Sequence, residues 1–142
     1  MKTVKQIVED KPHRLLCISP DKTVYEALRV MAEHEIGALV VIDEKKLVGM
    51  FSERDYARKV ILQGRASKQI FVSEIMTSRV VCVTPDRTAE ECMSIMTEKK
   101  VRHLPVVEEK TVMAMISIGD VVREMIADQQ QTIAQLEHYI TG

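Results

Sequence analysis

Two segments of the sequence, 65 positions apart, place a hydroxyl side chain three residues before a carboxylate. They are Ser52 with Asp55 and Ser117 with Asp120, and each pair stands between an apolar run typical of a strand and a helical pattern. A carboxylate accepts two hydrogen bonds from a vicinal diol, and bonds to a charged group are the stronger kind. A hydroxyl at a helix start lies beside backbone amides and the positive end of the helix dipole, which favours phosphate. Both pairs are therefore candidates for binding groups such as a vicinal diol or a phosphate.

The same spacing has a structural interpretation, the capping box, in which a hydroxyl and an acid satisfy the amides of a helix start. The box prefers Glu or Gln at its last position, and the sequence uses Glu in two other places, Thr23-x-x-Glu26 and Thr88-x-x-Glu91. Asp at both Ser-x-x-Asp positions suggests that these carboxylates have another task. Both interpretations remain open at this point.

An internal repeat organises the chain. Shifting the sequence by 65 residues aligns 14–61 with 79–126 without a gap. The identical pairs include Cys17/Cys82, Glu26/Glu91, Met31/Met96, Leu39/Leu104, Val41/Val106, Met50/Met115, Ser52/Ser117, Asp55/Asp120 and Arg58/Arg123. We therefore expect two repeats, residues 1–66 and 67–128, followed by a helical tail over 129–142.

The sequence pattern of each repeat predicts a strand, a helix, two strands and a second helix, in that order. The apolar runs 15–18 and 80–83 end at Ser-Pro or Thr-Pro, which leave the helical region. The capping boxes predict helices after Thr23 and Thr88, hairpins are expected over 39–51 and 104–116, and the last helices begin at Ser52 or Ser117. The expected fold class is α/β of the α+β kind: two βαββα repeats and a C-terminal helix. Because a lone repeat of about 60 residues buries little surface, the two are expected to pack as one pseudo-symmetric unit.

The tail carries apolar residues at 126, 133, 136 and 140, a narrow helical stripe. One interpretation is a helix that packs back on its own chain. The other is a contact between two copies of the protein. The sequence leaves both open.

Composition excludes several classes of protein. The net charge of −1 over 142 residues provides no general attraction to nucleic acid or to an anionic membrane. Apolar stretches such as 38–42 are far shorter than the ~20 residues that span a bilayer, and no signal region follows the first residues. The expected location is cytoplasmic.

Catalytic and metal-binding patterns are also missing from the sequence. Cys17, Cys82 and Cys92 show no CxxC spacing, and we expect three small buried hydrophobic residues rather than disulfides. The four histidines do not have the spacing of metal ligands on a helix. The sequence contains no nucleophile with an adjacent base, Walker motif or dinucleotide glycine fingerprint, so we expect neither an enzyme nor a metal site.

The chain resembles a tandem pair of CBS domains, an arrangement known as the Bateman module. It is similar to the small stand-alone bacterial members, which consist of this pair alone. The resemblance rests on the duplicated strand followed by Ser-x-x-Asp (49–55 and 114–120), on Val101-Arg102-His103-Leu104-Pro105-Val106, and on Glu74-Ile75-Met76-Thr77 at the start of the second copy. It covers about residues 4 to 127. The order of these motifs, repeated at a constant offset, makes the resemblance specific.

The resemblance implies a regulatory module that binds an adenosine-containing ligand in the cleft between the repeats. AMP is the first expectation, with NAD, ATP, ADP or S-adenosylmethionine as alternatives. In that family the aspartate holds the ribose diol, the Ser or Thr lies near ribose and phosphate, and strand backbone reads the adenine edge. Carried over, the ligand-binding residues are Cys17, Ile36, Gly37, Ala38, Ser52, Arg54, Asp55, Thr77, Cys82, Val101, Arg102, His103, Leu104, Pro105, Met115, Ser117 and Asp120.

The two implied sites differ in charge. The second repeat has Arg102 and His103 where the first has Gly37 and Ala38, and the guanidinium of arginine is well suited to phosphate. We therefore expect the second site to favour phosphorylated ligands. The alternatives are a solvated surface arginine and a structural histidine.

Two functions remain in view, a nucleotide sensor that signals to a protein partner and a structural dimerisation module with vestigial sites. The sequence does not identify the regulated partner. A homodimer is expected in either case, forming a flat disc. Residues 1–71 hold 13 basic and 10 acidic side chains and residues 72–142 hold 7 and 11, so head-to-tail stacking places unlike charges together.

Overall fold

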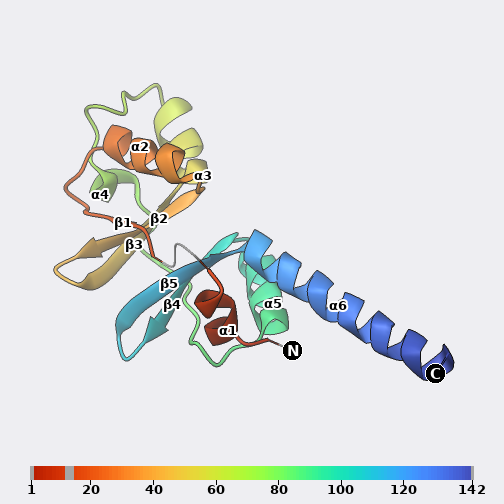
Figure 1. Ribbon diagram of the computed structural model, residues 1–142. Coiled ribbons are helices and arrows are strands. Elements are labelled where there is room, and N and C mark those ends of the chain that lie inside the picture. The colour runs from red at the N-terminus through yellow and green to blue at the C-terminus, as the bar shows by residue number, and fades with distance from the viewer. Residues whose placement is uncertain (1, 12–14, 142) are drawn as a thin grey trace. The chain divides into compact units, whose positions relative to one another are not determined.

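The computed structural model describes residues 2–11 and 15–141, and it divides into two compact units. One unit combines residues from 1–14, 82–107 and 114–142, and the other combines 15–81 with 108–113. Each unit contains most of one sequence repeat (Figure 1). We call them the Asp120 unit and the Asp55 unit after the aspartate that each contains.

The Asp55 unit is built on a three-stranded sheet. Strand β1 (Cys17–Ile18) runs parallel to β2 (Ala38–Asp43), which pairs antiparallel with β3 (Lys46–Ser52). Helix α2 (Val24–His34) begins at the predicted capping box of Thr23 and Glu26. Its buried face packs into the core of this unit, which comprises Val24, Ala27, Met31, Leu39, Val41, Phe51, Val60, Ile70, Val72 and Ile75. Full burial of one such aliphatic or aromatic side chain contributes ~1.5–3 kcal/mol.

The predicted helix at Ser52 is present, but its hydrogen-bond pattern changes after one turn. Helix α3 (Glu53–Tyr56) continues directly into a π-helical turn, η1 (Ala57–Ile61). A short helix, α4 (Val72–Ile75), follows the polar joining segment. The π-helical turn has no counterpart in the second repeat, where the helix after Ser117 is regular.

The Asp120 unit contains the remaining elements. They are α1 (Val4–Glu9), α5 (Ala89–Lys99), β4 (His103–Glu108), β5 (Thr111–Ser117) and α6 (Ile118–Thr141); the tip of the β4–β5 hairpin belongs to the Asp55 unit. Helix α5 begins at the predicted capping box of Thr88 and Glu91. The strand expected over 80–83 is reduced to a single parallel bridge between Val83 and Val106. Cys92 lies in the core, whereas Cys17 and Cys82 are exposed, so the expectation of three buried cysteines is wrong for two of them.

The segment that leads into each repeat packs on the other repeat. The amide of Val4 donates to the carbonyl of Arg87 (2.7 Å), and the amide of Val72 donates to the carbonyl of Lys22 (2.8 Å). Bridges between Thr3 and Thr88 and between Thr23 and Phe71 complete the two matching arrangements. The compact units therefore differ from the sequence repeats, because the repeats exchange their lead-in segments.

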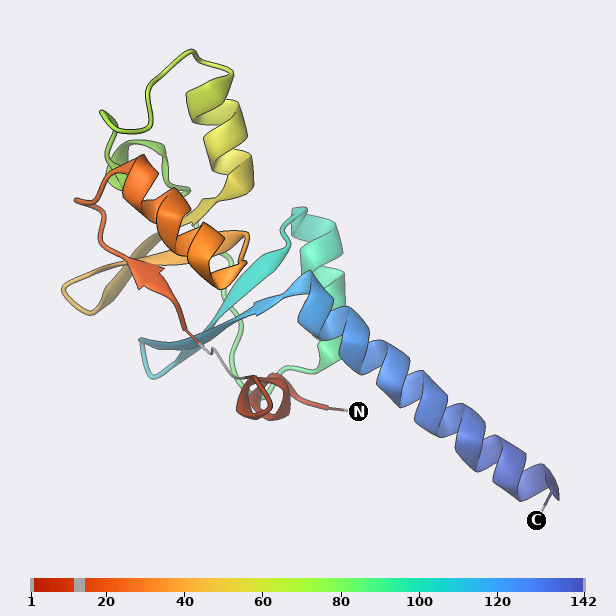
Figure 2. The ribbon, with the colours of Figure 1, turned by 45° about the horizontal axis from the view of Figure 1, so that its top comes forward.

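Helix α6 continues without a break through the predicted tail. Its first half packs on α5 and α1, whereas every described residue from 129 to 141 is exposed. Figure 2 shows this second half extending beyond the end of α5. The interpretation that the tail packs back on its own chain is therefore wrong. Within residues 2–11 and 15–141 no helix, α6 included, is both long and apolar enough to cross a bilayer.

Candidate functional site

Asp55 is buried at the junction of β3 and α3, where it closes a capping box with Ser52. The Ser52 amide donates to Asp55 Oδ2 over 3.0 Å, and the Asp55 amide donates back to Ser52 Oγ over 3.2 Å. The structural interpretation of the Ser-x-x-Asp motif is therefore correct as far as one carboxylate oxygen is concerned. It leaves the second oxygen for other partners.

That second oxygen, Asp55 Oδ1, faces Thr77 and Lys59. The Thr77 hydroxyl donates to it over 3.0 Å, and the Lys59 ammonium lies 3.1 Å away. Lys59 also donates to the carbonyl of Ile75 over 2.9 Å. Thr77 is held in place by backbone hydrogen bonds in both directions with Met50 on β3. The site thus joins a strand, a helix start and the segment after α4.

Asp120 has the same junction position between β5 and α6, but it is surrounded by more charge. Its Oδ2 accepts from the Ser117 amide and from the Lys11 ammonium, both at 2.7 Å, and its Oδ1 accepts from the Arg123 guanidinium at 2.7 Å. Lys11 also donates to the Met115 carbonyl over 2.7 Å. An open pocket of about 330 Å³ adjoins these groups, and its lining residues are Ile7, Asp10, Lys11, Asp120, Arg123 and Glu124.

Two pKa shifts describe the charge state of the Asp120 site. Burial alone would raise the pKa of Asp120, but the Lys11 ammonium and the Ser117 amide outweigh it and hold the pKa below its ordinary value. The pKa of His103 is lowered, first by burial and then by the positive charges of Lys11 and Arg102, against the opposing effect of Asp120. At neutral pH the site therefore presents an ionised carboxylate beside a neutral imidazole.

The carried-over residues divide between the two units. Cys17, Ile36, Gly37, Ala38, Ser52, Arg54, Asp55 and Thr77 lie in the Asp55 unit, and Cys82, Val101, Arg102, His103, Leu104, Pro105, Met115, Ser117 and Asp120 lie in the Asp120 unit. Ala38 and Leu104 are fully buried, so neither their side chains nor their backbone is exposed to a ligand. Cys17, Thr77 and Arg102 are exposed.

The helix starts offer fewer amide donors than the sequence suggested. The Glu53 amide donates to the Gly37 carbonyl (3.1 Å), and the Ile118 amide donates to the Arg102 carbonyl (2.8 Å). The amides of Asp55 and Asp120 are used in the capping boxes. Side-chain cations are therefore the stronger candidates for contact with a phosphate.

Sequence reasoning missed three cations at the aspartates, namely Lys11, Lys59 and Arg123. Lys59 and Arg123 stand four and three residues after their aspartates, a spacing at which helical side chains meet. That spacing could have revealed them. Lys11 lies more than 100 positions from Asp120, and no local signal connects the two.

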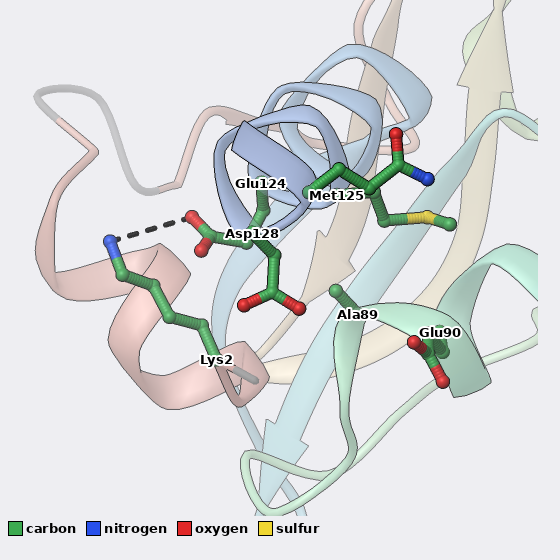
Figure 3. Close-up of a pocket in the computed structure, with 7 residues that line it drawn as sticks. Lys2, Ala89, Glu90, Glu124, Met125 and Asp128 are labelled. Atoms are coloured by element: carbon green, nitrogen blue, oxygen red, sulfur yellow. Dashed lines mark ion pairs between the residues drawn. The ribbon is translucent and has the colours of Figure 1, made fainter. Parts of the chain in front are cut away.

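A second hollow in the Asp120 unit is too small to hold a nucleotide. It lies between Lys2 and the facing parts of α5 and α6, with a volume of about 40 Å³, which suits water rather than an organic molecule. Figure 3 shows the ion pair between Lys2 and Glu124 beside it, with Glu90 and Asp128 facing the same space.

Comparison with known proteins shows which family the two repeats belong to. The family model described as CBS domain matches residues 4–61 and 72–127. The chain belongs to the CBS-domain family. The two matched segments correspond to the two repeats, and the mixed α+β architecture with a C-terminal helix is a CBS-pair fold.

Three relatives illustrate the range of this family. A putative signal-transduction protein with CBS domains from Burkholderia ambifaria MC40-6 is 46% identical in sequence, and its structure matches with a TM-score of 0.86. The match covers 90% of this chain and 96% of that chain. The CBS domain-containing protein CBSX3, mitochondrial, of Arabidopsis thaliana is 41% identical over 89% of this chain, which spans 64% of the plant protein's length. The CBS domain pair of protein MJ0100, solved with 5-methylthioadenosine and S-adenosyl-L-methionine, is 26% identical, with a TM-score of 0.76 and coverages of 90% and 98%.

Proposed function

We propose that this CBS pair is a regulatory module that binds adenosine-containing nucleotides at Asp55 and Asp120 and passes the ligand state to a protein partner. The observation that carries the proposal is the matched placement of two buried carboxylates at strand-to-helix junctions, each with an oxygen facing hydroxyl or cationic side chains. A ribose diol is a chemically suitable partner for such a carboxylate. AMP is the first candidate, and NAD, ATP, ADP and S-adenosylmethionine are the others.

The MJ0100 pair supports the adenosine part of the proposal. Its solved complex contains two ligands that share an adenosine group. The proposal extends that chemistry to this chain on the strength of the fold and of the two aspartates. The regulated partner is unidentified, and the cytoplasmic location stays a prediction.

Thermal unfolding with a panel of adenosine ligands tests the proposal. A ligand at one hundred times its dissociation constant stabilises the folded protein by ~2.7 kcal/mol, which raises Tm by about 5–10 °C for a chain of this size. The double variant Asp55→Asn with Asp120→Asn should lose the shift. Asp43→Asn, at the exposed end of β2, is the matched control and should keep it. An unchanged Tm with every ligand at millimolar concentration would refute the proposal.

At the second site we propose a preference for phosphorylated ligands. Arg102 is exposed and His103 is half-buried beside the charges of Asp120. AMP should bind more tightly than adenosine, and Arg102→Ala should narrow the difference. Equal affinity of the unaltered protein for the two ligands would contradict this preference.

A homodimer is the second part of the proposal, and α6 provides the observation that favours it. Ile126, Ile133 and Ile140 follow one another at intervals of seven residues, with Leu136 between the last two, and all four are 48–80% exposed. Such heptad spacing is typical of a seam between two helices. The same face would also serve the alternative function, a structural dimerisation module. Light scattering should give about twice the 16.2 kDa chain mass.

A further inference from the structure

Lys11 links Asp120 to a carbonyl of β5, as Thr77 links Asp55 to a carbonyl of β3, but Lys11 contacts the other carboxylate oxygen, Oδ2 instead of Oδ1. In the Asp55 unit the Thr77 amide donates to the Met50 carbonyl (2.8 Å) and its hydroxyl donates to Asp55 (3.0 Å). In the Asp120 unit the Lys11 ammonium donates to the Met115 carbonyl and pairs with Asp120, both at 2.7 Å. A neutral residue therefore joins the strand carbonyl to the carboxylate in one unit, and a cation does so in the other.

The charge around Asp120 is unbalanced by this exchange. Lys11 and Arg123 both pair with the single carboxylate of Asp120. The other acids that line the pocket, Asp10 and Glu124, share the single cation Lys2 at 3.2 and 3.4 Å, so that group has one negative charge in excess. The cluster of Lys11, Arg123 and Asp120 taken by itself has one positive charge in excess, and it lines the same pocket of about 330 Å³.

We propose that Lys11 contributes, beside Arg102, to the selectivity of the Asp120 site for nucleotides that carry a phosphate. The proposal rests on the function proposed above. The two hydroxyls of a ribose diol that donate to both oxygens of Asp120 compete with the Lys11 ammonium at Oδ2 and with the Arg123 guanidinium at Oδ1. The displaced ammonium, only 24% exposed, then needs a new anionic partner, because a partly buried cation without one is costly. A phosphate supplies that partner, whereas a neutral nucleoside does not.

Calorimetric titration of AMP and adenosine tests this role. It is carried out in the Asp55→Asn protein, so that only the Asp120 site reports. Replacing Lys11 with Met should weaken AMP binding by ~10-fold or more, about the contribution of one charge-assisted bond. The same change should tighten adenosine binding several-fold, because the internal competitor at Oδ2 is gone. Lys11→Arg keeps the charge and should keep the preference for AMP.

Lys5→Met is the matched control, since Lys5 is an exposed lysine on α1, and it should leave both affinities unchanged. Circular dichroism and thermal unfolding verify that each variant folds, and Lys11→Gln replaces Lys11→Met if the latter does not. A parallel loss of AMP and adenosine binding, or an unchanged ratio of the two affinities, would overturn the role of Lys11 and leave the proposed function standing. If the Asp55→Asn protein binds neither ligand, the proposed function fails at this site and the role of Lys11 fails with it.

Discussion

The Thr77 hydroxyl donates a hydrogen bond to Asp55 Oδ1 over 3.0 Å, although by sequence Thr77 belongs to the second repeat and Asp55 to the first. The contact exists because the lead-in segment of the second repeat packs in the Asp55 unit. A buried carboxylate in one repeat therefore depends on a side chain from the other. The sequence repeats are not independent in structure.

Thr77→Val should remove this hydrogen bond while keeping the shape of the side chain. We expect a loss of ~1 kcal/mol in the free energy of unfolding, the net value of one such bond, and weaker ligand binding at Asp55. Urea denaturation measures the first and calorimetry the second. Thr111→Val, at the exposed start of β5, is the control. If the two variants have equal stability, the Thr77 hydroxyl contributes nothing to the fold.

His103 should make stability depend on pH. Its pKa in the folded protein lies below 6.5, because burial and the charges of Lys11 and Arg102 outweigh the opposing pull of Asp120. As pH falls through 6.5 the unfolded chain takes up a proton that the folded protein resists, so stability present above 6.5 is lost below it. Thermal unfolding between pH 7.5 and 5.5 should show this fall, and His103→Gln should reduce it. His138→Gln, on the exposed end of α6, is the matched control.

Gly49 and Gly119 should respond in opposite directions to replacement by alanine. A Cβ at Gly49 would lie 2.7 Å from Met76 Sδ and 3.0 Å from the Thr77 carbonyl oxygen. Gly49→Ala should therefore cost ~1–3 kcal/mol through overpacking and should disturb the Thr77 contact. At Gly119 the nearest atom is 3.5 Å away, so Gly119→Ala should stabilise α6 by ~0.5–1 kcal/mol. Chemical denaturation of both variants tests the contrast, and a stabilising Gly49→Ala would contradict the structure.

Leu136→Glu should separate the proposed dimer without unfolding the chain. Leu136 is 57% exposed on α6 and lies beyond the part of the helix that packs on α5. A buried carboxylate in an apolar seam is strongly unfavourable, so the mass by light scattering should fall to that of one chain. Gln130→Glu adds the same charge outside the stripe of 126, 133, 136 and 140 and should remain dimeric. A dimer that survives Leu136→Glu must form through another surface.

Local sequence signals predicted much of the fold. The capping boxes at Thr23 and Thr88 begin α2 and α5 as expected, because a cap is decided by residues three positions apart. Both hairpins are present, although their turns place Glu44, Lys45, Glu109 and Lys110 at positive φ without the glycine or asparagine that such turns favour. The strand pattern alone located these turns.

Features that depend on distant residues were not predictable in the same way. The run 80–83 has strand character, yet it makes only one bridge, because an apolar run does not specify how many partners the sheet provides. The pairing of Lys11 with Asp120 depends on the exchanged lead-in segments, which leave no periodic pattern in the sequence. The functional roles of the predicted site residues remain predictions that the ligand experiments will decide.

The exchange of lead-in segments also affects the order in which parts of the chain fold during synthesis. The amide of Lys5 bonds to the carbonyl of Pro85, 80 positions later in the chain. At a synthesis rate of about 5–20 residues per second, Pro85 is synthesised roughly 4–16 s after Lys5, and α1 cannot form this contact earlier. Most of the Asp55 unit, residues 15–81, leaves the ribosome in the meantime. Nascent chains should therefore form structure in residues 15–81 before α1 packs against the segment that contains Pro85.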